Sequence, residues 1–254
     1  MEFLRKLTTE WWGILALCFA VLLLVFVLSI VFYRPFFKRF YDIVLSGLAI
    51  LVLSPVLLIL TVLGAIKMKG NPFFTQPRPG KNEKIFKLVK FRSMTCEKDE
   101  NGKLLPDEKR LTRYGKILRS TSLDELPELF NIFIGHMSIV GPRPQLVRDM
   151  VFMSDSVRKR HSVRPGLTGL AQVNGRNNAT WEDKFENDLA YLEKITLWKD
   201  LKIIFQTVFK VFKGSDVVRE GTVSDVDYGD WLLQKGEITQ EVYEEKIEES
   251  IAYL

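Results

Sequence analysis

The sequence predicts a mostly helical protein of the α+β class that is associated with a membrane. Two long apolar runs without charges lie in the first 66 residues, and most of the charge of the chain follows them. Beyond these runs, apolar residues recur mainly at helical spacing, and only Ile85–Phe91 reads as a strand, the arm of a short β-hairpin. We expect a transmembrane helix in residues 1–35, a membrane hairpin in 36–66, a globular domain in 67–213 and an acidic extension in 214–254.

The first apolar run, Trp11–Tyr33, predicts a transmembrane helix. It holds 23 residues without a charge, and as a helix it would be about 35 Å long, enough to cross a hydrocarbon core of about 30 Å. Aromatic residues stand at both of its ends, where aromatic belts form at membrane surfaces. A cleaved signal peptide is the alternative, but the run is long for one and no small-residue cleavage pattern follows it.

The charges around this run predict its orientation. On the N-terminal side, Arg5 and Lys6 are offset by Glu2 and Glu10, whereas residues 34–39 carry three basic residues and no acidic one. Because basic residues favour the cytoplasmic side, the C-terminal end of the run is expected in the cytoplasm.

The second apolar run, Ile43–Ile66, predicts a helix that is broken at its midpoint by Ser54 and Pro55. A proline in a helix removes one backbone donor, here freeing the carbonyl of Leu51, and kinks the helix. The Ser54 hydroxyl is placed to satisfy a nearby backbone group, which a hydrocarbon environment demands.

Basic residues flank the second run on both sides, with Lys38 and Arg39 before it and Lys67 and Lys69 after it. A spanning helix would place one of these pairs on the wrong side of the membrane. A re-entrant helix that enters, bends and leaves on the same face satisfies both pairs, and we favour it. An ordinary proline-kinked span is the alternative, because such prolines are tolerated in membranes.

The globular part has an unequal charge distribution. Residues 67–213 hold 28 Lys and Arg against 17 Asp and Glu, whereas residues 214–254 hold 3 against 11. A basic block attracts phosphate-bearing partners, and nucleic acid, anionic lipid and nucleotide-sugar all qualify by charge. Neither the dinucleotide-binding glycine pattern nor a Walker sequence is present in the chain.

Several helices are expected in this part. Thr112–Arg119 predicts a short basic helix, and Thr180 is placed to cap a helix that follows it. Leu197–Lys213 combines an aromatic and aliphatic stripe with lysines, which suits an amphipathic helix on an anionic membrane surface as well as a core helix with solvated lysines. Residues 215–230 read as an acidic loop, and Ile238–Ile251 as an acidic amphipathic helix.

Two groups of residues have the chemistry for a site. Pro142 and Pro144 restrict the backbone around Arg143, whose guanidinium can bind phosphate bidentately. Asp124 and Glu125 fit a capping box that starts at Ser122, and adjacent carboxylates at a helix start are usually capping groups. A carboxylate can also attack phosphorus, and two adjacent carboxylates can hold Mg²⁺.

The motifs together resemble the monotopic phosphoglycosyl transferases, the bacterial sugar transferase family that starts polyprenol-linked glycan assembly. The resemblance covers about residues 36–213. The matching residues are Lys38-Arg-Phe-Tyr-Asp42 before the Ser54-Pro55 run, Gln76-Pro-Arg-Pro-Gly80, Phe86-Lys-Leu-Val-Lys-Phe-Arg-Ser-Met94, Leu118-Arg-Ser-Thr-Ser-Leu-Asp-Glu-Leu-Pro-Glu-Leu129, Met137-Ser-Ile-Val-Gly-Pro-Arg-Pro-Gln145 and Arg164-Pro-Gly-Leu-Thr-Gly169.

The resemblance implies a re-entrant helix broken at Ser-Pro and a Mg²⁺-dependent ping-pong reaction at the cytoplasmic face of a bacterial inner membrane. Asp124 would attack the sugar-bearing phosphate of a UDP-sugar and release UMP. Undecaprenyl phosphate would then take the phosphosugar. Glu125 would assist as a second metal ligand or as a base for the lipid phosphate. The basic residues expected around the diphosphate are Lys90, Arg92, Arg119 and Arg143.

The chain departs from the shared pattern at both ends. The helix expected at Trp11–Tyr33 is absent from the smallest family members, and the acidic tail lies outside the shared core. Both segments are available for self-association, and a homodimer is one outcome; the tail could equally serve as a lid or a solvated helix. Anionic lipids are expected partners and nucleic acid is not.

Two other functions fit the same residues. The first is a glycosyltransferase that moves only the sugar and releases UDP, and the second is a non-enzymatic membrane scaffold for glycan assembly. The sugar itself is not specified by any of the motifs.

Overall fold

The computed structural model describes residues 2–175, 180–213 and 226–254, and the described chain is mostly helical, with two small sheets. The α-helices are α1 (Glu2–Val31), α2 (Lys38–Lys67), α3 (Asp107–Arg110), α4 (Arg113–Ser120), α5 (Glu128–Ile134), α6 (Val147–Met150), α7 (Asp155–Arg158), α8 (Leu170–Asn174), α9 (Trp181–Glu193), α10 (Leu197–Lys213), α11 (Tyr228–Lys235) and α12 (Gln240–Ile251). The strands are β1 (Phe73–Pro79), β2 (Ile85–Phe91), β3 (Ser138–Val140) and β4 (Gly166–Thr168). Short π or 3₁₀ turns are η1 (Tyr33–Phe37), η2 (Lys81–Glu83), η3 (Leu123–Glu125) and η4 (Lys159–Ser162).

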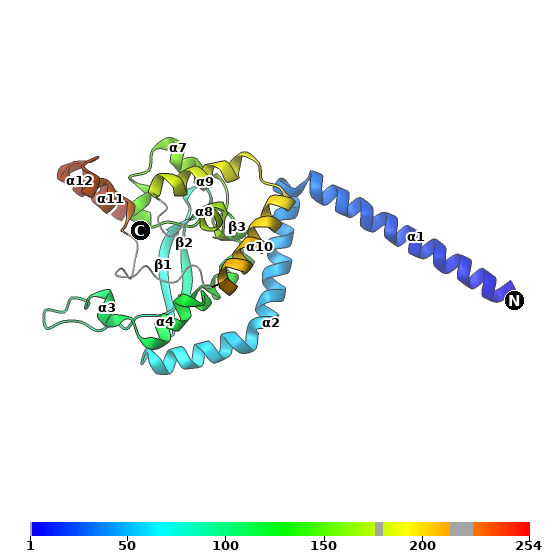
Figure 1. Ribbon diagram of the computed structural model, residues 1–254, viewed down its shortest axis with the longest axis horizontal. Helices are drawn as coiled ribbons and strands as arrows, with labels where there is room; N and C mark the ends of the chain where they lie inside the picture. The colour runs from blue at the N-terminus through cyan, green and yellow to red at the C-terminus, as the bar shows by residue number, and fades with distance from the viewer. Residues whose placement is uncertain (1, 176–179, 214–225) are drawn as a thin grey trace.

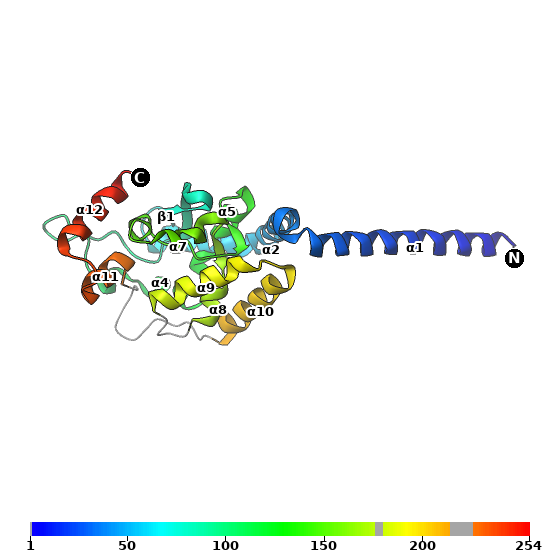
Figure 2. The same ribbon diagram turned by 90° about the horizontal axis from the view of Figure 1, so that it is seen from above.

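Two segments are long and apolar enough to cross a membrane by length and composition. Trp11–Val31 has a mean hydropathy of 3.3, and Tyr33–Lys67 has a mean hydropathy of 2.8. Figure 1 shows α1 projecting away from the body of the molecule, whereas α2 runs along the body and curves beneath it. The second view agrees that α1 points away from the body and that α11 and α12 lie at its opposite end (Figure 2).

Ser54 and Pro55 lie inside one continuous helix, α2, which bends along its length (Figure 1). The Ser54 hydroxyl donates to the carbonyl oxygen of Leu51 at 2.8 Å. This carbonyl is the one that Pro55 leaves without its helical donor. The predicted repair of the backbone by Ser54 is therefore confirmed.

Three residues at the start of α2 fasten this helix to the globular body. The Lys38 ammonium lies 2.5 Å from the Asp200 carboxylate, which also accepts hydrogen bonds from the hydroxyls of Tyr33 at 2.7 Å and Tyr191 at 2.8 Å. Tyr33 is thus buried against α10, and its expected place in an aromatic belt at the end of the first span is wrong.

Arg39 and Asp42 add two more attachments. Arg39 donates to the carbonyls of Ile132 and Phe133, at the C-terminal end of α5, where the last carbonyls of a helix lack partners. Asp42 accepts from the backbone N–H of Ile139 at 2.9 Å and is buried. The basic residues before the second run therefore serve internal contacts, so their charge is weaker evidence for topology than the sequence implied.

Both halves of α2 pack against the same body. Before the bend, Ala49, Ile50 and Leu53 contact a core that includes Ile132 and Met137. After the bend, Leu57 and Leu60 join a separate core with Phe91 and Leu118. The opposite side of the helix is apolar and exposed, as at Leu51, Val52, Leu58 and Ile59.

The predicted strand Ile85–Phe91 is confirmed with the same bounds, and it forms an antiparallel hairpin with β1. The sequence did not reveal β1, because Pro77 and Pro79 interrupt its strand pattern. A strand of a two-stranded sheet has a free edge, where a missing N–H is tolerated.

The second sheet was not expected, because β3 and β4 have only three residues each. They pair in parallel and bring two glycine-containing motifs together. A Cβ atom on Gly166 would lie 2.1 Å from the backbone N of Gly141, and one on Gly169 would lie 2.1 Å from the oxygen of Gly141. These glycines are needed because the two backbones touch.

The predicted helices formed largely where they were expected. Thr112 caps α4, and Thr180 caps α9 in a capping box with Asp183. Helix α10 has the predicted bounds, and its stripe of Trp198, Leu201, Phe205 and Val208 is exposed while Ile203 packs inward, which disfavours the core-helix interpretation.

The acidic extension differs from expectation in one respect. Helix α12 matches the predicted helix and is capped by Thr239, but residues 228–235 form α11 where a loop was expected to continue to residue 230. Residues 215–225 of that expected loop lie outside the described residues.

The close contact between β3 and β4 predicts that one added methyl group strongly destabilises the fold. Gly166→Ala forces a Cβ atom into backbone that cannot rotate away, so we expect destabilisation of at least about 1–3 kcal/mol, the usual cost of overpacking. The measurement is the thermal midpoint of the full chain in detergent. Gly70→Ala, where the nearest atom is 3.9 Å away, is the control and should unfold close to the unaltered chain. Equal midpoints for both variants would contradict the close approach.

Candidate functional site

The predicted site residues converge where the end of β2, the turn η3 and the loop after β3 meet. Glu125 lies at the centre, with its Oε1 atom 2.7 Å from the Lys90 Nζ and 2.6 Å from an Arg143 guanidinium nitrogen. Lys90 comes from β2 and Arg143 from the loop after β3, so two cations from separate segments hold one carboxylate oxygen.

The backbone around Asp124 is not the expected capping box. Ser122 is in the left-handed region, with φ of 54°, and its side chain makes no capping hydrogen bond. The 3₁₀ turn Leu123–Glu125 follows, and Pro127 then precedes α5. The capping box failed because Ser122 lacks the extended backbone of an N-cap residue and because α5 begins only at Glu128, beyond the dyad. Asp124 and Glu125 thus stand on a tight turn just before a helix.

The two adjacent carboxylates have different surroundings. Glu125 is held by two cations, whereas within the described residues no hydrogen bond or ion pair engages the Asp124 carboxylate. Burial and the charge of Glu125 raise the pKa of Asp124, and Lys90, Arg119 and Arg143 oppose this shift. Burial also raises the pKa of Glu125, but Arg143 and Lys90 outweigh it and bring that pKa to about 2.

Glu128 belongs to the same cluster, although from the sequence we predicted no role for it beyond its place in a motif. It is buried in the first turn of α5, and its Oε1 atom lies 3.1 Å from the Lys90 Nζ. Burial raises its pKa to about 7, with Lys90 opposing the shift and the charge on Glu125 adding to it. Lys90 therefore serves two carboxylates, of which Glu125 keeps its charge and Glu128 takes up a proton near neutrality.

The two remaining predicted arginines lie differently. Arg119 is among the charges that act on Asp124, and its Nε donates to the buried hydroxyl of Ser93 at 3.0 Å. Arg92 instead reaches the carbonyl of Phe73 on the neighbouring strand, at 3.4 Å. The structure thus gathers Lys90, Arg119 and Arg143 around the dyad, whereas the side chain of Arg92 is directed to β1. Ser93 could not be found from sequence, because only the fold brings it to Arg119.

A magnesium site at the dyad would need ligands in addition to the described carboxylates. In the part of the chain that the structure describes, no three His, Cys, Asp or Glu side chains lie close enough to hold a metal ion together. Mg²⁺ is commonly bound by one or two carboxylates, with phosphate oxygens and water completing its shell. Asp124, whose carboxylate has no hydrogen-bond or ion-pair partner among the described residues, and its neighbour Glu125 fit that pattern.

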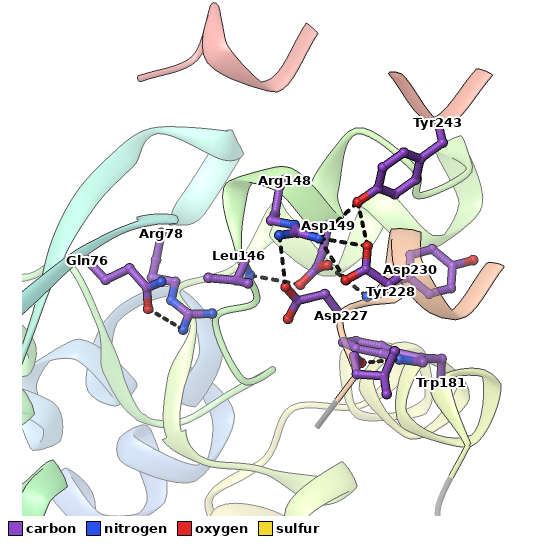
Figure 3. Close-up of polar contacts among 11 residues, drawn as sticks. Gln76, Arg78, Leu146, Arg148, Asp149, Trp181, Asp227, Tyr228, Asp230 and Tyr243 are labelled. Carbon is purple, nitrogen blue, oxygen red and sulfur yellow. Dashed lines mark hydrogen bonds and ion pairs between the residues drawn. The ribbon is translucent and has the colours of Figure 1, made fainter. Parts of the chain in front are cut away.

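The acidic extension docks on α6, the helix that follows the Arg143 loop, and Figure 3 shows its residues around Arg148 and Asp149. Arg148 in α6 lies 3.3 Å from Asp227 and 2.9 Å from Asp230, and it also donates to the hydroxyl of Tyr243. The next residue, Asp149, accepts from the backbone N–H of Tyr228. The charge of the extension is thus partly used to attach it, and a cavity of about 600 Å³ lies between α12, α6 and β1.

Comparison with known proteins places these motifs in a family. Residues 33–214 match the family model described as "Bacterial sugar transferase". The chain is 43% identical over 189 residues to the uncharacterized sugar transferase EpsL of Bacillus subtilis, covering 74% of this chain and 93% of that protein. It is 44% identical over 187 residues to the UDP-glucose:undecaprenyl-phosphate glucose-1-phosphate transferase of Klebsiella pneumoniae, covering 69% of this chain and 40% of that protein.

A third relative differs in the sugar that its name specifies. The UDP-N-acetylgalactosamine-undecaprenyl-phosphate N-acetylgalactosaminephosphotransferase of Aeromonas hydrophila is 36% identical over 190 residues, covering 70% of this chain and 44% of that protein. The chain therefore spans nearly all of one relative and less than half of the other two.

The carboxylate cluster predicts a pH dependence of stability. Between its ordinary pKa of 4.5 and about 7, Glu128 holds a proton in the folded protein that the unfolded chain has released. The contribution of Glu128 to the free energy of unfolding therefore falls as pH rises through that window, and it is constant outside the window. We expect Glu128→Gln to gain stability relative to the unaltered chain as pH rises from 4.5 to 7.

Thermal midpoints across pH 4 to 8 check this expectation. Glu241→Gln, on the exposed surface of α12, controls for the loss of a carboxylate as such. If the midpoint of Glu128→Gln instead falls relative to that of the unaltered chain as pH rises, Glu128 is ionised in the folded state.

Proposed function

The chain belongs to the bacterial sugar transferase family, and we propose that, as a phosphoglycosyl transferase, it moves a sugar-1-phosphate from a UDP-sugar to undecaprenyl phosphate. The observation that carries the proposal is the asymmetry of the dyad. Asp124 has no partner among the described residues, beside a Glu125 that two cations hold in place. An unengaged carboxylate among cations is suited to attack an electrophile that arrives as an anion.

The first half-reaction forms a covalent intermediate. A carboxylate oxygen of Asp124 attacks the sugar-bearing phosphorus of the UDP-sugar, and the bond from that phosphorus to the bridging oxygen breaks. The bridging oxygen leaves with the electron pair as part of UMP. Lys90, Arg119 and Arg143 stand where they can neutralise charge on the transferring oxygens, which is the main demand of phosphoryl transfer.

The second half-reaction returns the enzyme to its starting state. A phosphate oxygen of undecaprenyl phosphate attacks the same phosphorus, and the bond to Asp124 breaks with its electrons returning to the carboxylate. The product is a polyprenol diphosphate-sugar. Glu125, whose pKa is lowered by Arg143 and Lys90, keeps these two cations oriented, and it would also serve as a metal ligand or as a base for the lipid phosphate.

Asp124 and Glu125 would hold Mg²⁺ together with diphosphate oxygens of the substrate. When bound there, the ion supplies positive charge to the phosphate oxygens. Lys90, Arg119 and Arg143 act on the same dyad, so these side chains would share the charge of the diphosphate with the ion.

We also propose that α2 is a re-entrant membrane helix and that the site faces the cytoplasm. Support comes from the packing of α2, because both of its halves contact one globular body while its other side is apolar and exposed. A helix whose two ends are fastened to one body cannot leave them on opposite sides of a bilayer. The exposed aromatic stripe and lysines of α10 add an interfacial surface beside it.

The reaction predicts which nucleotide is released. With undecaprenyl phosphate and a panel of UDP-sugars, we expect UMP from at least one sugar, and the active sugar identifies the substrate. Asp124→Asn should lower turnover by roughly 10³-fold or more and trap no phosphosugar, because the nucleophile is lost. Asp155→Asn, on an exposed helix end, is the matched control. Release of UDP would indicate transfer of the sugar alone, and no nucleotide release at all would favour a scaffold.

The topology is tested by labelling single cysteines in intact cells and in inverted vesicles. Cys18 and Cys96 are first replaced by serine, and then Arg34→Cys, Lys67→Cys or Thr9→Cys is introduced. We expect residues 34 and 67, both exposed at the ends of η1 and α2, to react with an impermeant maleimide from the same, cytoplasmic side. Residue 9 should react from the other side. Labelling of residues 34 and 67 from opposite sides would establish a spanning helix instead.

A further inference from the structure

The loop that carries Arg143 rests on a buried ion pair that the proposed chemistry does not use. Arg160 in η4 is 1% exposed, and its Nε and Nη2 atoms lie 3.0 Å and 2.5 Å from the same oxygen of Asp188 in α9. Burying two charges costs several kcal/mol per ion before their attraction offsets it, so a pair of this kind is weak evidence for stability. The contacts that the pair makes say more about its role than its contribution to stability does.

Arg160 connects this pair to the site through the backbone. The same Nη2 atom that contacts Asp188 also donates to the carbonyl oxygen of Arg143 at 2.7 Å. The side chain of Arg143 in turn lies 2.6 Å from Glu125. A guanidinium has a rigid planar fork, so fixing one edge on Asp188 fixes the direction in which the other donors point.

A second arginine holds the next carbonyl of the same loop. Arg78 from β1 donates to the carbonyl of Pro144 at 3.1 Å, and its other terminal nitrogen is held by Gln76 at 2.7 Å (Figure 3). The backbone of Arg143 is therefore held from two elements, η4 and β1. Its proline neighbours Pro142 and Pro144 further reduce the conformations that it can reach.

We infer that Arg160 and Asp188 are positioning residues for the proposed transfer reaction, which keep the Arg143 guanidinium on Glu125 and over the diphosphate. The inference rests on the proposed function for its kinetic consequence. Displacement of a catalytic group by about 1 Å costs on the order of 10²-fold in rate. Loosening this pair should therefore lower activity through Arg143, without removing any group that touches the substrate.

The test is a double-mutant cycle on the full chain, assayed by UMP release with the UDP-sugar that gives the highest rate. Asp188→Asn keeps the shape of the side chain but removes its charge, and we expect kcat/KM to fall about 10- to 100-fold. In an Arg143→Gln background the same change should alter kcat/KM by less than about twofold, because the group that it positions is gone. Equal losses in both backgrounds, or no loss in the first, would overturn the inference.

A neighbouring ion pair supplies the matched control. Arg158 pairs with Glu83, which also contacts His161 of η4, and among the described residues no hydrogen bond or ion pair joins these three side chains to the Arg143 loop. Glu83→Gln should leave kcat/KM within about twofold of the unaltered chain. Should Asp188→Asn fail to fold, Arg160→Lys keeps the charge opposite Asp188 but loses the fork that reaches the Arg143 carbonyl.

One measurement does not depend on activity. Hydrogen exchange at the backbone amides of residues 141–146, followed by mass spectrometry, should accelerate in Asp188→Asn and in Arg160→Lys but not in Glu83→Gln. Unchanged exchange in this loop would overturn the inference even if the variants lost activity. Absence of UMP release from the unaltered chain would refute the proposed function and leave the exchange result to decide whether the pair holds the loop.

Discussion

The attachment of α2 to the globular body is the constraint on which the rest of the structure depends. At its centre, the buried Asp200 carboxylate accepts from Lys38, Tyr33 and Tyr191, and these residues come from the start of the apolar helix, from the turn before it and from α9. Removing any donor would leave a buried charge poorly compensated, and such a loss is strongly destabilising. The same attachment places the site of the globular body beside an apolar helix. A water-soluble sugar nucleotide and a lipid phosphate, the proposed substrates, would meet there.

The cations of the candidate site are shared unequally among its carboxylates, and this unequal sharing gives the adjacent carboxylates different properties. Lys90 and Arg143 converge on Glu125, which keeps its charge, while Glu128 shares Lys90 and is protonated near neutrality. Asp124 remains without a partner among the described residues. Neighbouring carboxylates compete for the same cations. The surroundings of each side chain, and not its residue type, therefore make Glu125 a structural anion and leave Asp124 as the potential nucleophile.

Patterns that depend on nearby residues were predicted well from the sequence, and patterns that depend on distant ones were not. The strand Ile85–Phe91, the helix Leu197–Lys213 and the repair of the Pro55 break by Ser54 all follow from local periodicity or backbone chemistry. The expected capping box at Ser122 failed even locally, because Ser122 adopts left-handed backbone angles instead of the extended ones of an N-cap. Strands β1, β3 and β4 were missed, since prolines mask the first and the other two are stabilised mainly by pairing with each other.

The sequence by itself determined the family, the membrane-length apolar segments and the identity of the charged residues around the dyad, because these are properties of composition, spacing and motif. Only the tertiary structure decided which carboxylate each cation holds, that Glu128 and Ser93 belong to the site, and that Arg160 supports the Arg143 loop. The physical reason is that ion pairing and burial act over a few ångströms in space. Residues 35 positions apart, such as Lys90 and Glu125, come within that range only after the chain has folded.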